Sequence, residues 1–205
     1  ISVRNPENPK HFFLSCSRSP EIVSIEDIME FDLEGNNVDG SILRPYGERF
    51  IHGALLEARP EIQSVVHNHS LSVIPFGVTN TPLLPIIHTG AAIGRNIPTW
   101  DIHDNFGDTD LLVRNMEQGR DLAKTMGQAN VVLMRGHGCS VVGSSIKEAT
   151  LTAVYLQISA TVQLQSMSLG DVRYLTPGET DECTNMFYSD LSVDRVWENL
   201  TTRVK

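Results

Sequence analysis

RPEIQSVVHNHS, residues 59–70, is the stretch that decides the fold of this chain. Its Arg-Pro pair predicts the end of a helix, because proline pushes the preceding residue out of the helical region. The run from Ile62 to His67 is short and rich in β-branched residues, which favours a strand. Side chains alternate along a strand, so His67 and His69 are expected to project from the same face. The stretch therefore joins a helix to a strand that carries two imidazoles.

The flanking sequence alternates between helical and extended patterns. Helices are predicted over residues 45–58, 110–126 and 145–169 and from 177 onwards, where apolar residues recur at three- and four-residue spacing. A Ser-x-x-Glu capping box at Ser145 marks the start of the third helix. Short apolar or alternating runs predict strands at 11–16, 29–33, 62–67, 83–87, 130–134 and 141–142, with a polar loop at 98–110. Strands interleaved with helices of this length indicate one α/β layered domain over residues 1–205.

Composition places the chain among ordinary globular domains. It has 205 residues, of which 40% are hydrophobic and 20% charged, and a formal net charge of −9. Without a Lys/Arg-rich run, this acidity argues against nucleic acid or an anionic membrane surface as the partner. No apolar stretch approaches the length of a membrane span. The cysteines are odd in number and far apart, which does not fit a disulfide framework, so a reducing, cytoplasmic compartment is expected.

Two further elements extend the histidine pair toward a metal site. His137 stands between two glycines directly after the apolar run at 130–134, where a sharp turn would leave its imidazole unshielded. Glu48 lies in the first turn of the helix that leads into the HxH strand. Each feature alone also fits an ordinary polar turn, and the sequence permits their convergence without requiring it. Three histidines and one glutamate would suit one divalent ion, Zn²⁺ or Mn²⁺, with Fe²⁺ as a further candidate.

The order of these motifs resembles the class II aldolase/adducin family. The resemblance rests on ERFIH at residues 48–52, on the segment 59–70 and on the strand that ends in His137, and it covers nearly the whole chain. It implies a three-layer α/β/α fold with a central, mostly antiparallel or mixed sheet. It also implies a homotetramer whose active sites lie between neighbouring subunits. The residues to which it assigns the metal are His67, His69, His137 and Glu48, the last as either the fourth ligand or the acid/base group.

Departures from the family pattern bear on the substrate. Sugar-phosphate aldolases of this family hold the substrate phosphate with a serine pair just before the glutamate, where this chain has Tyr46-Gly47. That difference speaks against a phosphorylated substrate. The opening residues Ile1–Arg4 resemble the tail of a second substrate-binding turn, so a preceding N-terminal segment is expected. A branch of the family that decarboxylates hydroxypyridine and dihydroxybenzene dicarboxylates is instead similar at 13–21, 100–109 and 133–138.

The resemblance therefore predicts a metal-dependent lyase that decarboxylates a hydroxy-substituted pyridine or benzene carboxylate or dicarboxylate. A metal chelated by the substrate hydroxyl and carboxylate would act as a Lewis acid toward the charge that develops as CO₂ leaves. Glu48 or a water would then return a proton to the ring carbon. The expected partner is a small aromatic or heteroaromatic carboxylate, with no role for nucleic acid or membrane.

Several other side chains are candidates for the substrate pocket. Arg18, with Ser17 and Ser19 beside it, carries the planar guanidinium that matches a second carboxylate, although a surface arginine in a turn is the alternative. His88 follows an apolar run and is a candidate acid/base group or ring contact. His52 lies one helical turn after the glutamate, where it would either hydrogen-bond a metal ligand or simply pack.

Three other functions fit the same residues less well. A sugar-phosphate aldolase or epimerase would use the same metal site on a different substrate. A non-haem iron oxygenase would use the same ligands with Fe²⁺ and would need oxygen for turnover. An adducin-like interaction module would need no chemistry, and the presence of all three histidines together with Glu48 speaks against it.

Overall fold

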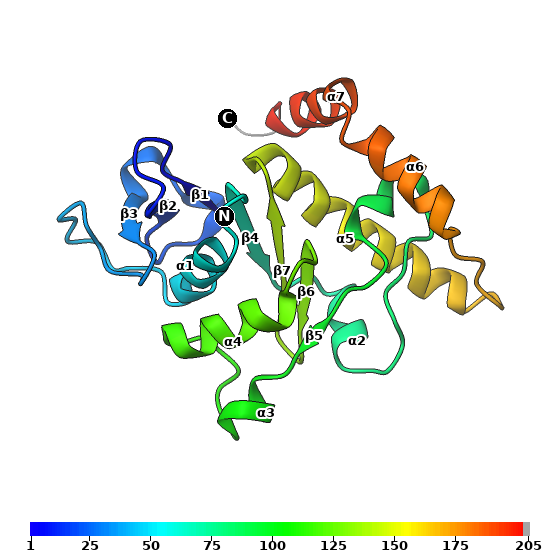
Figure 1. Cartoon of the computed structure of the whole chain (residues 1–205), viewed down its shortest axis with the longest axis horizontal. Helices are drawn as coiled ribbons and strands as arrows, with labels where there is room; N and C mark the ends of the chain where they lie inside the picture. The colour runs from blue at the N-terminus through cyan, green and yellow to red at the C-terminus, as the bar shows by residue number, and fades with distance from the viewer. Residues whose placement is uncertain (203–205) are drawn as a thin grey trace.

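Seven strands form one sheet in the computed structural model, which describes residues 1–202 (Figure 1). They are β1 (Ser2–Arg4), β2 (His11–Ser15), β3 (Ile28–Asp32), β4 (Ser64–Asn68), β5 (Thr99–Trp100), β6 (Val131–Met134) and β7 (Gly138–Gly143). Their order across the sheet is β3-β2-β1-β4-β7-β6-β5. Neighbouring strands are antiparallel except β5 and β6, which run parallel. The expected mixed, mostly antiparallel sheet is therefore confirmed.

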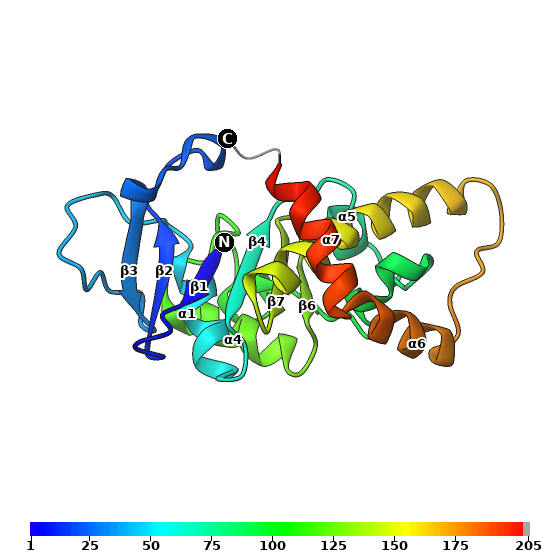
Figure 2. The same cartoon turned by 90° about the horizontal axis from the view of Figure 1, so that it is seen from above.

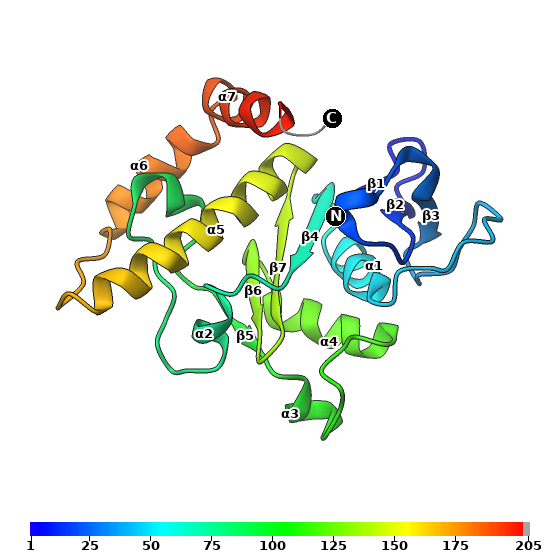
Figure 3. The same ribbon diagram turned by 180° about the vertical axis from the view of Figure 1, so that it is seen from behind.

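Helices cover both faces of this sheet (Figures 1 and 3). The helices packed on one face are α1 (Arg49–Ala58) and α4 (Met116–Met126). Those on the other face are α2 (Ile74–Gly77), the 3₁₀ helix η3 (His88–Ile93) and the long α5 (Ile146–Met167). Outside α5 and η3 lie α6 (Pro177–Phe187) and α7 (Asp190–Thr201). The remaining short helices are η1 (Pro20–Ile22), η2 (Ile25–Asp27) and α3 (Ile102–Phe106). With helices on both faces of the sheet, the predicted three-layer α/β/α fold is confirmed.

Alternation along the central strands divides the core in two. Val65 of β4 and Val132 of β6 point to the α1–α4 side, whereas Val66 and Leu133 point to the α5 side, and all four are buried. An uninterrupted apolar strand such as β6 suits this position because both of its faces are covered. Figure 2 shows the central strands between the β1–β3 end of the molecule and the α5–α7 end. The strands from which the histidines come are thus held from both sides.

The helix predicted over 110–126 begins later than expected, at Met116. Asn115 caps it, since the Asn115 side chain accepts a hydrogen bond from the N–H of Gln118. Leu111 has a φ of 65°, which lies outside the right-handed helical region. The apolar spacing had suggested a continuous helix, but the backbone before Asn115 follows tertiary contacts instead.

Two further predictions are corrected around β5. The stretch 98–110 is not a plain loop, because it contains β5 and α3, and the Asp101 side chain caps α3. The run 83–87 is extended but is not a strand. Pro82 and Pro85 lack the N–H groups that a strand ladder requires, and this run packs against α5 through the Gln163 side chain.

Helix boundaries differ slightly from the predictions at two other places. The helix predicted over 45–58 begins at Arg49 and leaves Glu48 at its N-cap position. Ser145 caps α5 as predicted, but the Glu148 carboxylate bonds to Ser144 rather than closing the box. Across residues 1–202, each helix is too short or too polar to cross a membrane.

Candidate metal centre

Sheet register brings the three histidines together. β4 and β7 are antiparallel neighbours, and the last residue of β4 pairs with the second residue of β7. His67 therefore lies near the end of β4, with His69 just beyond it, beside the turn that carries His137 into β7. Gly138 permits this close approach, because a Cβ there would stand 2.2 Å from the Asn68 carbonyl oxygen.

Glu48 reaches the same point from the N-terminal end of α1. The residue is buried, with 7% of its surface exposed. Its Oε2 atom lies 3.4 Å from Nε2 of His67, and its Oε1 atom lies 3.5 Å from Nε2 of His137. The Oε1 atom also accepts a hydrogen bond from the Val113 amide at 3.2 Å. The carboxylate is thus held between two imidazoles and a backbone donor.

The four side chains are spaced as a tetrahedral metal site requires. Nε2 of His69 is 3.2 Å from Nε2 of His67 and 2.9 Å from Nε2 of His137, and the four ligand atoms lie within 4.8 Å of one another. Ligands at about 2.1 Å from a tetrahedral Zn²⁺ stand roughly 3.4 Å apart, so these spacings fit an ion among them. Nδ1 of His67 lies 3.1 Å from the Cys139 carbonyl oxygen, a contact that directs the Nε2 atom of His67 toward the other members of the cluster.

The charge state of the cluster also suits a cation. Burial would raise the pKa of Glu48, but the imidazoles of His137 and His67 interact with its carboxylate and hold that pKa well below its usual range. Burial first, and then the neighbouring imidazoles, lowers the pKa of His69. Near neutral pH the carboxylate is therefore ionised and the His69 imidazole neutral, which are the forms that bind a divalent ion.

A cavity of about 320 Å³ opens beside His67, on the α1 side of the sheet. Its volume is at the lower end of the range for small-molecule sites. Polar and apolar side chains share its wall, among them Arg18, Tyr46, His52, Leu14, Val23 and Ile28. Arg18 and His52, two of the predicted pocket residues, therefore line the same cavity as His67.

Arg18 is held at this cavity by a buried carboxylate. Its Nη1 atom donates to both oxygens of Asp27, at 2.9 and 2.8 Å, while the Arg18 side chain remains 44% exposed. Hydrogen bonds from the Ser24 amide and then from Arg18 lower the pKa of Asp27 to about 2. Ser17 and Ser19 are exposed and do not line the cavity. Of the three residues predicted to bind a substrate carboxylate, Arg18 is therefore the one that lines this cavity.

His52 lines the cavity but bonds away from the cluster. Its Nδ1 atom lies 2.8 Å from Oγ of Ser2. Burial lowers the pKa of His52 well below its usual value, so this imidazole is neutral. Among residues 1–202 it makes no hydrogen bond to a member of the cluster. The alternative of packing thus describes His52 better than the predicted bond to a metal ligand.

His88 lies elsewhere in the fold. It begins η3 and lines a second cavity of about 570 Å³, together with Tyr155, Phe187 and Arg195. Because η3 packs against α5 and α6, this cavity is on the opposite face of the sheet from α1. Within one chain the structure does not bring His88 to the cluster.

Two contributors to the site lie outside the sequence prediction. Tyr46 lines the cavity, and burial together with the charge of Glu48 raises its pKa to about 12, so its hydroxyl keeps its proton near neutral pH. Its position two residues before Glu48 was a sequence signal for this role. The Val113 amide had no such signal, because every residue except proline offers the same backbone donor.

The family model of the class II aldolase and adducin N-terminal domain matches residues 1–164. The chain therefore belongs to the class II aldolase and adducin family. A decarboxylase, tropJ of Talaromyces stipitatus, is 36% identical over 182 residues, which cover 82% of this chain and 68% of the relative. A 3,4-dihydroxyphthalate decarboxylase of Arthrobacter keyseri is 30% identical over 180 residues, which cover 83% and 70%.

Solved structures agree on the fold. An aldolase II superfamily protein from Pseudomonas syringae superposes with a TM-score of 0.79 at 20% identity, over 98% of this chain and 81% of that one. An L-fuculose 1-phosphate aldolase superposes with a TM-score of 0.74 at 19% identity, over 92% and 84%. At these identities the likeness establishes the architecture alone. Class II aldolases use a divalent metal, and the Glu/His cluster of this chain fits one.

Proposed function

We propose that this chain is a metal-dependent carboxy-lyase that decarboxylates a hydroxy-substituted benzene or pyridine carboxylate or dicarboxylate. The observation that carries the proposal is the convergence of Glu48, His67, His69 and His137 beside a cavity that an arginine lines. The relatives at 30% identity or above that are decarboxylases, among them the two described above, support this reaction over others in the family. We propose Zn²⁺ or Mn²⁺ as the ion, one per subunit, with Fe²⁺ as the alternative.

The side chains of the proposed metal centre have two roles in breaking the carbon–carbon bond, namely metal binding and proton transfer. The three imidazoles and the Glu48 carboxylate would hold the ion, which when bound supplies a Lewis acid for the negative charge that develops on the substrate. As CO₂ leaves, the electron pair of the broken bond stays on the ring carbon, and a proton must be delivered there. Tyr46, whose hydroxyl is protonated, lines the cavity, and Glu48 belongs to the cluster that borders the cavity through His67. We assign proton return to Glu48 or to a water beside it. Because the carboxylate is ionised near neutral pH, Glu48 would first accept this proton from the substrate hydroxyl and then pass it to the ring carbon.

The cavity wall supports an aromatic acid as the substrate. The apolar side chains of Leu14, Val23 and Ile28 suit a planar ring. The Arg18 guanidinium suits a second carboxylate, and its bonds to Asp27 fix the direction of its remaining N–H groups. The chain carries a net charge of −9, so local positive charge, rather than the overall field, must attract an anionic substrate.

We further propose that the working enzyme is a homotetramer in which His88 serves the metal centre of a neighbouring subunit. His88 is exposed, and its open cavity also contains Arg195, a group that an acidic ligand would favour. Because the same histidine is remote from the cluster of its own chain, a role in catalysis requires a second subunit. The three cysteines are all free, which supports our proposal of a cytoplasmic location.

The decisive experiment combines elemental analysis with a substrate panel. The purified protein is incubated with hydroxybenzene and hydroxypyridine mono- and dicarboxylates, with and without oxygen, and CO₂ release is followed. We expect bound transition metal and CO₂ release that is independent of oxygen. A strict oxygen requirement would identify an oxygenase instead, and turnover of sugar phosphates alone would identify an aldolase.

The variant Glu48→Gln separates the two roles open to this carboxylate. If Glu48 is a metal ligand, metal content and activity fall together. If Glu48 returns the proton, the metal is retained while kcat falls. Both results keep the proposed reaction, whereas an active and metal-loaded Glu48→Gln variant would contradict both roles.

A further inference from the structure

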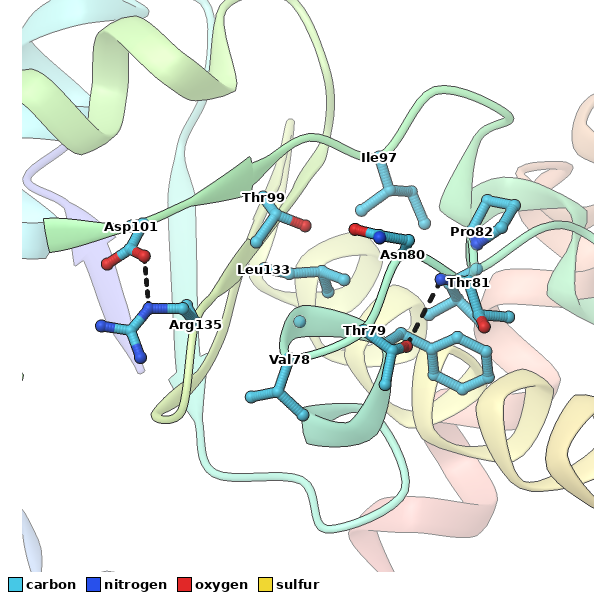
Figure 4. Close-up of a pocket in the computed structure, with 13 residues that line it drawn as sticks. Val78, Thr79, Asn80, Thr81, Pro82, Ile97, Thr99, Asp101, Leu133 and Arg135 are labelled. Carbon is cyan, nitrogen blue, oxygen red and sulfur yellow. Dashed lines mark hydrogen bonds and ion pairs between the residues drawn. The ribbon is translucent and has the colours of Figure 1, made fainter. Parts of the chain in front are cut away.

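Residues 101–113, which lie between β5 and α4, contact Glu48 and the turn of His137 without containing any of the four proposed metal ligands. Its first contact is an ion pair. One oxygen of Asp101 accepts the His103 amide at 2.9 Å and caps α3, and the other accepts Nε of Arg135. Figure 4 shows this pair at the edge of a cavity of about 410 Å³. Arg135 opens the turn that carries His137, so the ion pair ties that turn to α3.

The second contact is made by a residue with an uncommon backbone. Leu111 has a φ of 65°, which a bulky side chain seldom adopts. The Leu111 side chain packs on Gly136, the residue before His137, with its Cδ1 atom 3.4 Å from the position that a Cβ on Gly136 would occupy. It also contacts the buried core of the α1–α4 face. Strained residues persist where their surroundings hold them in place, and they concentrate at functional sites.

The third contact is the hydrogen bond from the Val113 amide to Oε1 of Glu48, at 3.2 Å. The Val113 side chain is fully buried, so the amide has little freedom to move. Leu111 is two residues away, and its left-handed conformation sets the direction in which the chain enters this position. One segment therefore holds both Glu48 and the turn of His137.

We propose that residues 101–113 are the positioning element of the metal centre, with Asp101 and Leu111 as its two positioning side chains. The inference rests on the proposed metal site and adds to it the residues that hold two of the ligands in place. Asp101 restrains the turn through Arg135, Leu111 restrains it through Gly136, and Val113 orients the Glu48 carboxylate. Ligands held in this way need less rearrangement when an ion binds, which raises metal affinity.

Two substitutions, each of which removes one ion pair, test this contact. Asp101→Asn keeps a capping side chain for α3 but removes the charge that holds Arg135. Asp194→Asn is the control, because it removes an exposed ion pair with Lys147, between α7 and α5 and outside residues 101–113. Binding of Co²⁺ to the metal-free protein is measured by competition with a chromophoric chelator, and the visible spectrum of bound Co²⁺ reports the coordination geometry. We expect Asp101→Asn to weaken Co²⁺ binding about 10-fold, and Asp194→Asn to leave it unchanged.

Leu111→Asn tests the packing contact, because asparagine tolerates the left-handed conformation but is too short and polar to replace leucine on Gly136. We expect about tenfold weaker Co²⁺ binding, an altered Co²⁺ spectrum and faster hydrogen exchange at the Val113 amide. Leu111→Met keeps an apolar contact and should restore wild-type affinity. Circular dichroism of each metal-free variant establishes that it is folded, and Asp101→Asn carries the test if Leu111→Asn is not.

Wild-type Co²⁺ affinity and spectrum in both Asp101→Asn and Leu111→Asn would overturn the inference. Equal weakening in Asp101→Asn and Asp194→Asn would overturn it as well, because the loss of any surface ion pair would then be sufficient to weaken Co²⁺ binding. These readouts do not depend on turnover. Weakened Co²⁺ binding in a protein that decarboxylates nothing would retain the positioning element and reject the proposed reaction.

Discussion

The cavity beside His67 and the cavity beside His88 lie on opposite faces of one sheet and differ in what borders them. At the first, His67 lines the cavity and belongs to a cluster of three imidazoles and one carboxylate, all supplied by one chain. At the second, a histidine, an arginine and a tyrosine border an open space, and the cluster found among residues 1–202 is not there. The difference teaches that strand pairing and the packing of α1 assemble the proposed metal ligands within one subunit. The groups on η3 and α7 would need a neighbouring subunit to take part in the proposed chemistry.

The largest effect is expected from His69→Ala, which removes one of the four proposed metal ligands. Loss of several kcal/mol of charge stabilisation corresponds to a fall in kcat of roughly 10³-fold, and the bound metal should fall with it. Elemental analysis and CO₂ release measure the two together. His11→Ala is the control, since His11 pairs with Glu30 of the neighbouring strand and is not a member of the cluster. Full activity in a metal-free His69→Ala protein would remove the cluster from the mechanism.

His88→Ala probes the second cavity. Loss of an acid/base group lowers kcat about 10²-fold, while the metal content should stay at the wild-type level because His88 is remote from the cluster. Mixing unfolded His69→Ala and His88→Ala chains and refolding them together gives a sharper test. In a tetramer with shared sites, about a quarter of the sites would regain both histidines. Activity that stays at the level of the two separate variants would mean that the cavities do not cooperate across subunits.

Arg18→Ala is expected to act on substrate capture rather than on the chemical step. A charge-assisted hydrogen bond to the substrate corresponds to roughly a 10- to 100-fold change in binding, which should appear as a raised KM for dicarboxylates. Monocarboxylates lack the group that Arg18 would bind, so their KM should change little. Arg18→Lys keeps the charge but loses the planar guanidinium that can donate two hydrogen bonds to one carboxylate, so an intermediate KM is expected. An equal rise for both substrate types would contradict the assigned role.

The smallest effect concerns Asp27, the carboxylate that accepts two hydrogen bonds from Arg18. The folded pKa of Asp27 is about 2, below the ordinary 3.8, so this carboxylate contributes stability that is present above pH 3.8 and is lost as the pH falls toward 2. Asp27→Asn should therefore lower Tm by a few degrees at pH 6. The difference from wild type should shrink as the pH falls through this window, which thermal melts at several pH values measure. A difference that is constant with pH would show that packing, and not charge, accounts for it.

Local patterns predicted much of the architecture. The strand within residues 59–70 and the helix before it could be predicted because period-two and period-3.6 patterns are local properties of the chain. The same periodicity correctly put His67 and His69 on one face. It failed for Leu111, whose apolar side chain matched a helical stripe while its backbone is left-handed. It also failed for the run 83–87, where prolines interrupt an apolar pattern that otherwise resembles a strand.

The sequence by itself determined the residue types of the metal site and the elements from which they come. Only the tertiary structure decided that Glu48 meets the histidines, because this depends on how α1 packs on the sheet and on the pairing of β4 with β7. The tertiary structure likewise placed His88 on the opposite face and put residues 101–113 against Glu48 and the turn of His137. The physical reason is that periodicity reports the neighbours of a residue along the chain. Contacts between distant segments arise from the packing of the whole core.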